Sequence, residues 1–102
     1  MNLEKFRGVV RRTWNMNLPM SERKSHAVLT LTTEAAEVAD IWKKAAFSNR
    51  PDKVGGVDMM HLAEEIGDVL YGVLATCEEF GIEPEYCMDV TARKLEKRYD
   101  AT

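Results

Sequence analysis

Glu34-Ala35-Ala36-Glu37 is the first of two acidic stretches in this sequence, and Glu64-Glu65-Ile66-Gly67-Asp68 is the second. Each places two carboxylates three residues apart in an otherwise apolar, helix-favouring run. Residues at i and i+3 share one face of a helix, so the carboxylates of each pair point the same way. If the two helices pack side by side, four carboxylates converge and require cations to neutralise them. The candidate metal ligands are Glu34, Glu37, Glu65 and Asp68, and carboxylates suit Mg²⁺, with Mn²⁺ as an alternative.

Length and charge limit the classes of protein that this chain can be. Its 102 residues are 45% hydrophobic, which predicts a single domain over residues 1–102 with a core of modest size. The net charge of −3 argues against general binding of nucleic acid. Residues 57–90 hold nine acids and no Lys or Arg, whereas residues 1–25 hold six Lys or Arg and two acids. This separation is compatible with a cationic anion site beside an acidic metal site, and equally with solvated surface.

The sequence also indicates where the protein works. No window approaches the roughly 18 consecutive apolar residues of a membrane span, and the first residues lack the apolar run of a secretory signal. Cys77 and Cys87 are not spaced as a CxxC motif. We therefore expect a cytoplasmic protein with reduced thiols and no membrane partner.

Apolar residues recur every three or four positions and predict four helices, with no strand-like alternation. The expected ranges are 3–15, from 22 or 25 to 47, 57–80 and 84–99, and residues 48–56 form the one obvious loop. Ser21 is the expected N-cap of the second helix, and Asp58 an acid in the first turn of the third. Gly81 and Pro84 mark a helix stop and restart.

The third helix changes character along its length. From Val69 to Cys77 it is apolar or small on nearly every side, and such a helix is buried on every side. In a four-helix chain of this size, a second subunit is needed to cover one face. The sequence therefore predicts an all-α, four-helix, bundle-like fold that is completed by dimerisation.

A carboxylate-bridged di-iron bundle is a rival interpretation of the acids, because it too uses inward-facing glutamates. That site requires Glu-x-x-His twice. The two histidines are His26 and His61, and the residues three positions before them are Arg23 and Asp58. The ligand count therefore excludes the di-iron site. His61 lies one turn before Glu65, where it can either approach the metals or remain exposed.

Two longer segments carry a family resemblance. Residues 31–40 (LTTEAAEVAD) and 62–71 (LAEEIGDVLY), with the closing segment 94–99 (KLEKRY), resemble the MazG-type all-α nucleoside triphosphate pyrophosphohydrolases. That family carries Glu-Glu-x-x-Glu on one helix and Glu-x-x-Asp on the next. The likeness covers residues 26–99. The sequence departs from the pattern at Thr33, where the first Glu usually falls, and Glu64 is a candidate to substitute for that acid in part.

The resemblance implies an activity and a site. The family hydrolyses nucleoside triphosphates between the α- and β-phosphates through a metal-activated water, giving the monophosphate and pyrophosphate. By position, Glu34, Glu37, Glu65 and Asp68 hold Mg²⁺ and are the catalytic acids. The resemblance further implies a homodimer or a dimer of dimers.

Other residues are candidates for holding the substrate. Lys94 and Arg98 are an i, i+4 pair that can bind phosphate, and Lys44 can join them from the second helix. Trp14 and Asn15 can contact the base, although Trp14 is equally suited to the core. The rival function is a non-catalytic helical dimer that binds nucleotide or a partner helix, and Thr33 is the feature that favours it.

Overall fold

The computed structural model describes residues 1–14, 17–47 and 56–99. These residues form four helices and no strand: α1 (Leu3–Thr13), α2 (Met20–Phe47), α3 (Met59–Phe80) and α4 (Pro84–Arg98). The expected all-α class is confirmed. No helix among these residues combines the length and the apolar composition that a membrane span requires.

Two of the expected helix starts are wrong. α2 begins at Met20, directly after Pro19, whose carbonyl accepts hydrogen bonds from the backbone of Glu22 and Arg23, so Ser21 lies inside the first turn instead of capping it. α3 begins at Met59, because Asp58 is its N-cap. The Asp58 carboxylate accepts hydrogen bonds from the backbone N–H groups of the first turn, which satisfies donors that have no partner within the helix.

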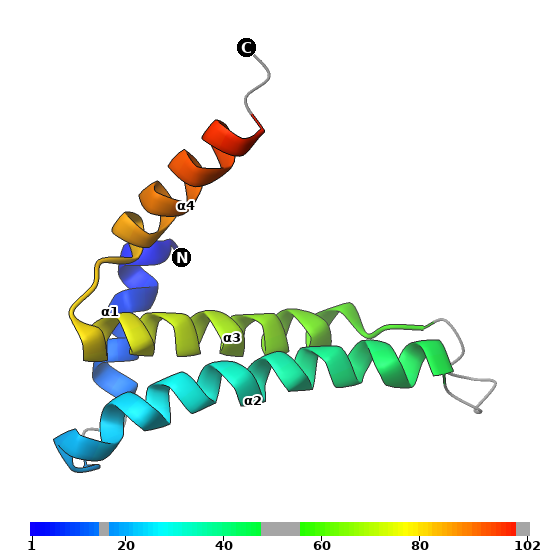
Figure 1. Cartoon of the computed structure of the whole chain (residues 1–102). Coiled ribbons are helices and arrows are strands. Elements are labelled where there is room, and N and C mark those ends of the chain that lie inside the picture. The colour runs from blue at the N-terminus through cyan, green and yellow to red at the C-terminus, as the bar shows by residue number, and fades with distance from the viewer. Residues whose placement is uncertain (15–16, 48–55, 100–102) are drawn as a thin grey trace.

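α2 and α3 run antiparallel and side by side, and α1 packs across the end where α3 finishes (Figure 1). α2 and α3 approach closely at Gly72, where an added Cβ would lie 3.3 Å from the Leu31 side chain. The core joins α1, α2 and α3 through a small set of buried side chains, namely Val10, Trp14, Ala27, Leu74 and Ala75. The long α2–α3 pair thus brings the two acidic stretches next to each other.

α4 leaves this assembly instead of packing along it (Figure 1). Gly81 ends α3 in the left-handed conformation, with φ of 66°, and the chain turns away. The radius of gyration is 17.0 Å, whereas a compact domain of this length has about 13 Å. A single copy of the chain therefore does not close into a compact bundle.

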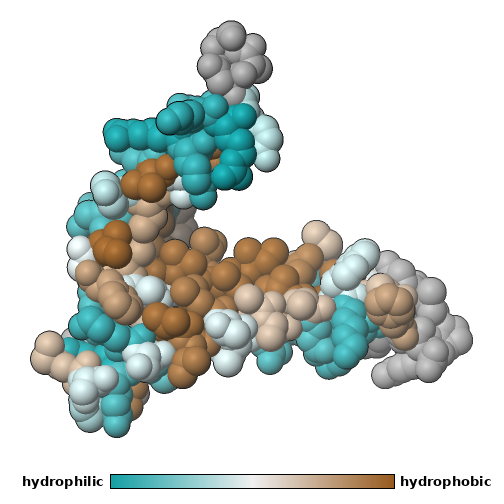
Figure 2. All heavy atoms as spheres, in the orientation of Figure 1, coloured by the Kyte–Doolittle hydropathy of each residue, from teal (hydrophilic) through white to brown (hydrophobic). Residues whose placement is uncertain are grey.

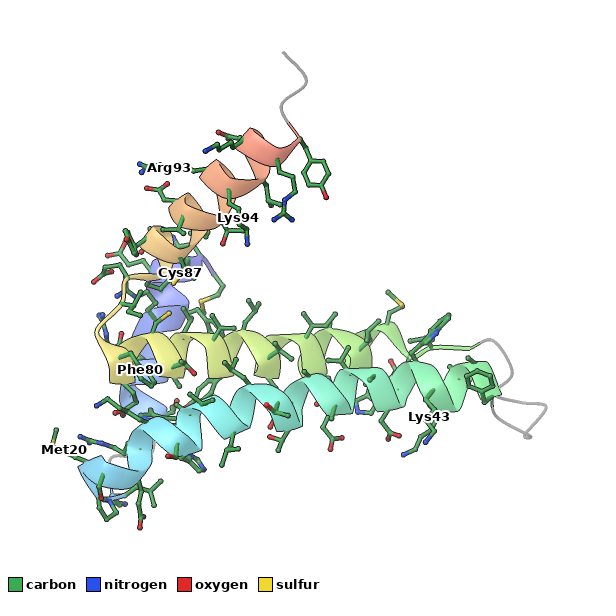
Figure 3. All side chains as sticks on the ribbon, in the orientation of Figure 1. Met20, Lys43, Phe80, Cys87, Arg93 and Lys94 are labelled. Atoms are coloured by element: carbon green, nitrogen blue, oxygen red, sulfur yellow. The ribbon has the colours of Figure 1, made fainter. Side chains whose placement is uncertain are left out.

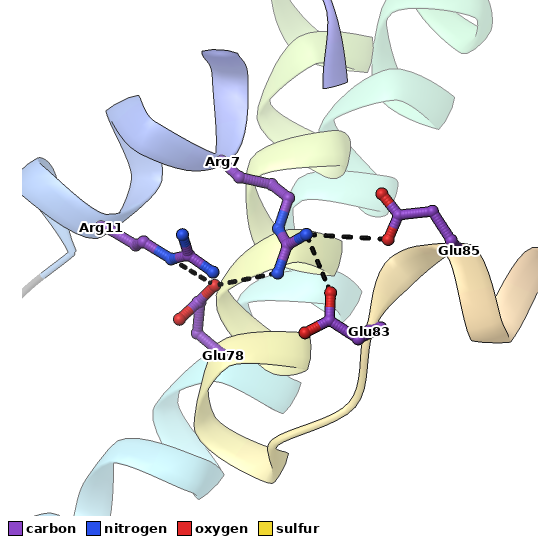
Figure 4. A network of polar contacts seen from close by, with 5 residues as sticks. All are labelled: Arg7, Arg11, Glu78, Glu83 and Glu85. Carbon is purple, nitrogen blue, oxygen red and sulfur yellow. Dashed lines mark hydrogen bonds and ion pairs between the residues drawn. The ribbon is translucent and has the colours of Figure 1, made fainter. Parts of the chain in front are cut away.

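An ion-pair network holds the start of α4 (Figure 4). Arg7 of α1 pairs with Glu83 at 2.9 Å, with Glu85 at 3.6 Å and with Glu78 at 3.8 Å, and Arg11 donates to Glu78 at 2.8 Å. The hydrogen bond to Glu83, outweighing the effect of burial, raises the pKa of Arg7. The α3–α4 turn is thus anchored to α1.

Apolar side chains remain exposed on α3 and α4. On α3, Ile66, Leu70 and Val73 follow one face and are 45%, 50% and 37% exposed. Figure 2 shows apolar surface extending along the α2–α3 arm. On α4 and at its C-cap, the exposed large apolar residues are Tyr86, Met88, Val90, Leu95 and Tyr99. The expectation that Val69–Cys77 is buried on every side is therefore not met within one copy.

Candidate functional site

Three of the four acids that the sequence singles out lie together. Glu34 on α2 and Glu65 and Asp68 on α3 each offer a carboxylate oxygen, and these oxygens lie within 4.8 Å of one another. Glu34 and Glu65 are half-buried and Asp68 is exposed. We call these three residues the acidic cluster. Oxygen donors at this spacing fit a hard divalent cation.

The electrostatics of the cluster act on Glu34. Burial, followed by the negative charges of Asp68, Glu65 and Glu37, raises the pKa of its carboxyl above the ordinary value of 4.5. Both causes penalise the charged form of the side chain, and a cation between the helices would relieve both. The cluster therefore has the electrostatic character of a cation site.

The remaining candidates around the cluster lie at its edge. Glu37 is exposed, and its negative charge helps to raise the pKa of Glu34. Its carboxylate is not one of the three that converge. Glu64 is exposed and also lies outside the cluster. His61 contacts Glu65, with Nε2 3.4 Å from Oε1. Its ring thus touches a cluster acid from outside.

One pocket adjoins the cluster on the side of α1. It has a volume of about 490 Å³, and we call it the aromatic pocket. Its lining residues are Thr13, Trp14, His26, Thr30, Thr33, Glu34, Asp68 and Tyr71. Two cluster acids therefore form part of its wall. Rings and hydroxyl groups supply the rest.

Trp14 is fixed in this wall by contacts to all the neighbouring helices. Its indole Nε1–H donates to Glu79 at 2.8 Å, and Arg23 lies 3.5 Å from the same carboxylate oxygen. The ring packs against His26, with centroids 5.1 Å apart, and lies 6.2 Å from the ring of Tyr71. Trp14 is only 7% exposed, so it serves the core and the pocket wall together.

A second pocket lies on the other side, between the end of α2 and the start of α3. Its volume is about 550 Å³, and its lining includes Glu37, Lys43, Lys44 and His61. We call it the lysine pocket. Lys44 pairs with Asp40 at 2.8 Å, and this hydrogen bond raises the pKa of Lys44 and lowers that of Asp40. The pocket is thus lined by both lysines and acids.

The other predicted substrate residues are not at the cluster in a single copy. Lys94 and Arg98 are exposed on α4, which projects away from the α2–α3 pair (Figure 3). Asn15 and most of the expected loop over residues 48–56 lie outside the described residues. The chain alone therefore assembles acids and an aromatic wall, without these two cations.

Sequence reasoning missed several pocket residues. His26, Thr30 and Tyr71 were not predicted to line a site, although each lies within eight residues of a predicted acid on the same helix. Thr13 was missed although it precedes Trp14. The spacing of Tyr71, three residues after Asp68, places both on one helix face and was a usable signal.

Comparisons with known proteins give one match. The profile of the MazG nucleotide pyrophosphohydrolase domain matches residues 23–102. Comparison with curated proteins gives no match, and comparison with solved structures gives none either. The matched segment contains both acidic stretches and all of α3 and α4, so the resemblance noted in the sequence is confirmed.

Proposed function

The chain belongs to the MazG nucleotide pyrophosphohydrolase family, and on this premise we propose that it hydrolyses a (deoxy)nucleoside triphosphate between the α- and β-phosphates. The products are the nucleoside monophosphate and pyrophosphate. The observation that carries the proposal is the convergence of Glu34, Glu65 and Asp68 between two pockets. Residues 1–102 act in it as one catalytic domain.

The acidic cluster would hold Mg²⁺, or Mn²⁺ in its place, with Glu37 as a fourth ligand from the next turn of α2. Bound there, the ion would supply charge neutralisation for the phosphates and acidify water. His61, in contact with Glu65, would orient that carboxylate.

The two pockets suggest how the nucleotide lies. The aromatic pocket shares Glu34 and Asp68 with the cluster and offers ring faces, which suit a nucleobase. The lysine pocket contains Lys44 and begins at Glu37, so it suits the distal phosphates. In this orientation Trp14 contacts the base and the scissile bond lies at the cluster.

A second copy of the chain would complete the site. The exposed apolar faces of α3 and α4 would be buried from water in a homodimer or a dimer of dimers. Since α4 points away from its own cluster, we propose that Lys94 and Arg98 reach the cluster of the second copy. There they would bind phosphate oxygens and stabilise the charge that develops on pyrophosphate.

Thr33 favours a second candidate, a helical dimer that binds nucleotide without cleaving it. The Thr33 hydroxyl donates to the Thr30 carbonyl at 3.2 Å and supplies no carboxylate where the family pattern has one. A pyrophosphate-release assay with Mg²⁺ and each common nucleoside triphosphate separates the two. Release that disappears with a chelator supports the hydrolase, whereas tight nucleotide binding without release supports the binding protein.

A further inference from the structure

Each hydroxyl group that lines the aromatic pocket already donates its proton to another group of the protein. Thr13 Oγ1 lies 2.8 Å from the Val9 carbonyl, which can only accept, so the Thr13 proton points to Val9. Thr13 Oγ1 also lies 2.7 Å from the Tyr71 hydroxyl. Because Thr13 has no second proton, Tyr71 must be the donor in that bond. The Tyr71 oxygen therefore faces the pocket only as an acceptor.

The hydroxyl groups of the two pocket threonines on α2 also donate their protons within the protein. Thr30 donates its hydroxyl proton to the His26 carbonyl at 2.7 Å. Thr33 donates to the Thr30 carbonyl at 3.2 Å. A hydroxyl that donates back to its own helix keeps only its lone pairs for a ligand. Both oxygens are thus acceptors toward the pocket.

The remaining described lining residues add little donor capacity. The Trp14 indole N–H donates to Glu79. The two carboxylates of the wall, Glu34 and Asp68, only accept hydrogen bonds when ionised. His26 supplies the one uncommitted N–H among these side chains. The aromatic pocket is therefore rich in acceptors and poor in donors.

From this inventory we infer that the aromatic pocket selects a nucleobase carrying an exocyclic amino group over its oxo counterpart. An amino group brings N–H donors to the acceptors, and Tyr71 is the specificity-determining acceptor. An oxo group would bring a further acceptor, for which His26 is the one uncommitted side-chain donor among the described lining residues, and Tyr71 could donate to it only by breaking its bond to Thr13. The inference rests on the proposed function, because it takes this pocket as the base site of that enzyme.

Two pairs of nucleotides test the inference; within each pair the amino group is exchanged for an oxo group, and the neighbouring ring nitrogen carries a proton only in the oxo member. The α,β-imido analogues of dCTP and dUTP, and those of ATP and ITP, are titrated calorimetrically into the full chain with Mg²⁺. The amino member of each pair should bind roughly ten- to a hundredfold more tightly, the range expected when one polar group is left unsatisfied. Equal affinities, tighter binding of the oxo members, or no binding of any analogue would overturn the inference.

Two substitutions should reduce the preference by opposite routes. Tyr71→Phe removes the acceptor, so the dCTP analogue should lose roughly tenfold in affinity while the dUTP analogue is unchanged. Thr13→Val frees the Tyr71 proton, so the dUTP analogue should gain several-fold while the dCTP analogue is unchanged. Tyr86→Phe and Thr32→Val make the same chemical changes at exposed positions outside the pocket and serve as controls. Equal loss for both analogues in Tyr71→Phe would contradict the role of Tyr71.

Turnover is measured separately on the hydrolysable nucleotides, so the two proposals fail in different ways. A preference in binding without pyrophosphate release would support the inference and overturn the proposed hydrolase. Pyrophosphate release with no preference between dCTP and dUTP in binding would support the hydrolase and overturn the inference.

Discussion

A carboxylate oxygen of Glu34, on α2, lies within 4.8 Å of a carboxylate oxygen of Asp68, on α3. Two helices hold these acids together because Gly72 lets α3 approach Leu31 closely. Like charges at this spacing repel in the absence of a cation. Part of the folding free energy is therefore used to hold these carboxylates together.

The first prediction concerns the stability of the metal-free protein. The folded state raises the pKa of Glu34, so as pH rises above 4.5 the unfolded chain loses this proton first and the folded state is disfavoured. Glu34→Gln should remove this loss and raise the thermal midpoint in EDTA at neutral pH. Glu64→Gln, an exposed acid outside the cluster, is the matched control. A lower midpoint for Glu34→Gln across the pH range would contradict the prediction.

The second prediction concerns cation binding. Asp68→Asn removes one charged ligand, so Mg²⁺ affinity measured by calorimetry should fall at least about tenfold while the helical circular dichroism is retained. Turnover should be abolished in Asp68→Asn and also in Glu37→Gln. Glu64→Gln should bind and turn over like the wild type. Full activity in either of the first two variants would show that the acid is not a ligand.

The third prediction concerns assembly. Val73 lies on the exposed apolar face of α3, so Val73→Glu should prevent a second copy from covering this face. Light scattering at low micromolar concentration should then give a monomer or aggregate instead of the wild-type oligomer. Met20→Glu is the control, because it adds the same charge at the far end of α2. A monodisperse, well-folded wild-type monomer would count decisively against a subunit interface here.

The fourth prediction concerns the cations of α4. Arg98→Ala should lower kcat/KM by roughly ten- to a thousandfold, because a charged hydrogen-bonding partner of the phosphates is lost. Mg²⁺ affinity without nucleotide should barely change, since Arg98 is not a ligand. Lys94→Ala should behave similarly. Wild-type kinetics in both variants at low and physiological salt would leave these residues as solvated helix surface.

A mixing experiment then tests whether the cations act across subunits. Asp68→Asn lacks one acid of the cluster and Arg98→Ala lacks the cation, so each variant alone should be inactive or impaired. Unfolding and refolding them together forms mixed dimers in which one site has both groups intact. Partial recovery of activity is expected if Arg98 serves the second copy. No recovery despite mixed dimers would place the cation at the cluster of its own chain.

The helices were predictable because their signals are local. Gly81 and Pro84 correctly marked the end of α3 and the start of α4, and the three- and four-residue spacing identified α2 and α3. Asp58 and Ser21 were assigned wrongly because a side chain near a helix start can cap it or lie in its first turn. That choice depends on backbone angles, which the sequence pattern does not specify.

The site was predictable only in part. Spacing placed each acid pair on one helix face, but which acids meet depends on the register of α2 against α3, in which Gly72 lies close to Leu31. That register groups Glu34 with Asp68 and leaves Glu37 toward the lysine pocket. The aromatic pocket needs Thr13 from α1 beside Tyr71 from α3, a contact between residues far apart in sequence that no local pattern contains.

The most direct test of the central claim is to identify the products formed from a nucleoside triphosphate by the wild type and by Asp68→Asn. Chromatography of the nucleotide, together with an enzymatic assay for pyrophosphate, distinguishes the two cleavage positions. The account predicts equal amounts of nucleoside monophosphate and pyrophosphate from the wild type with Mg²⁺, and neither product from Asp68→Asn. Release of nucleoside diphosphate and phosphate, or the same products at the same rate from Asp68→Asn, would contradict it.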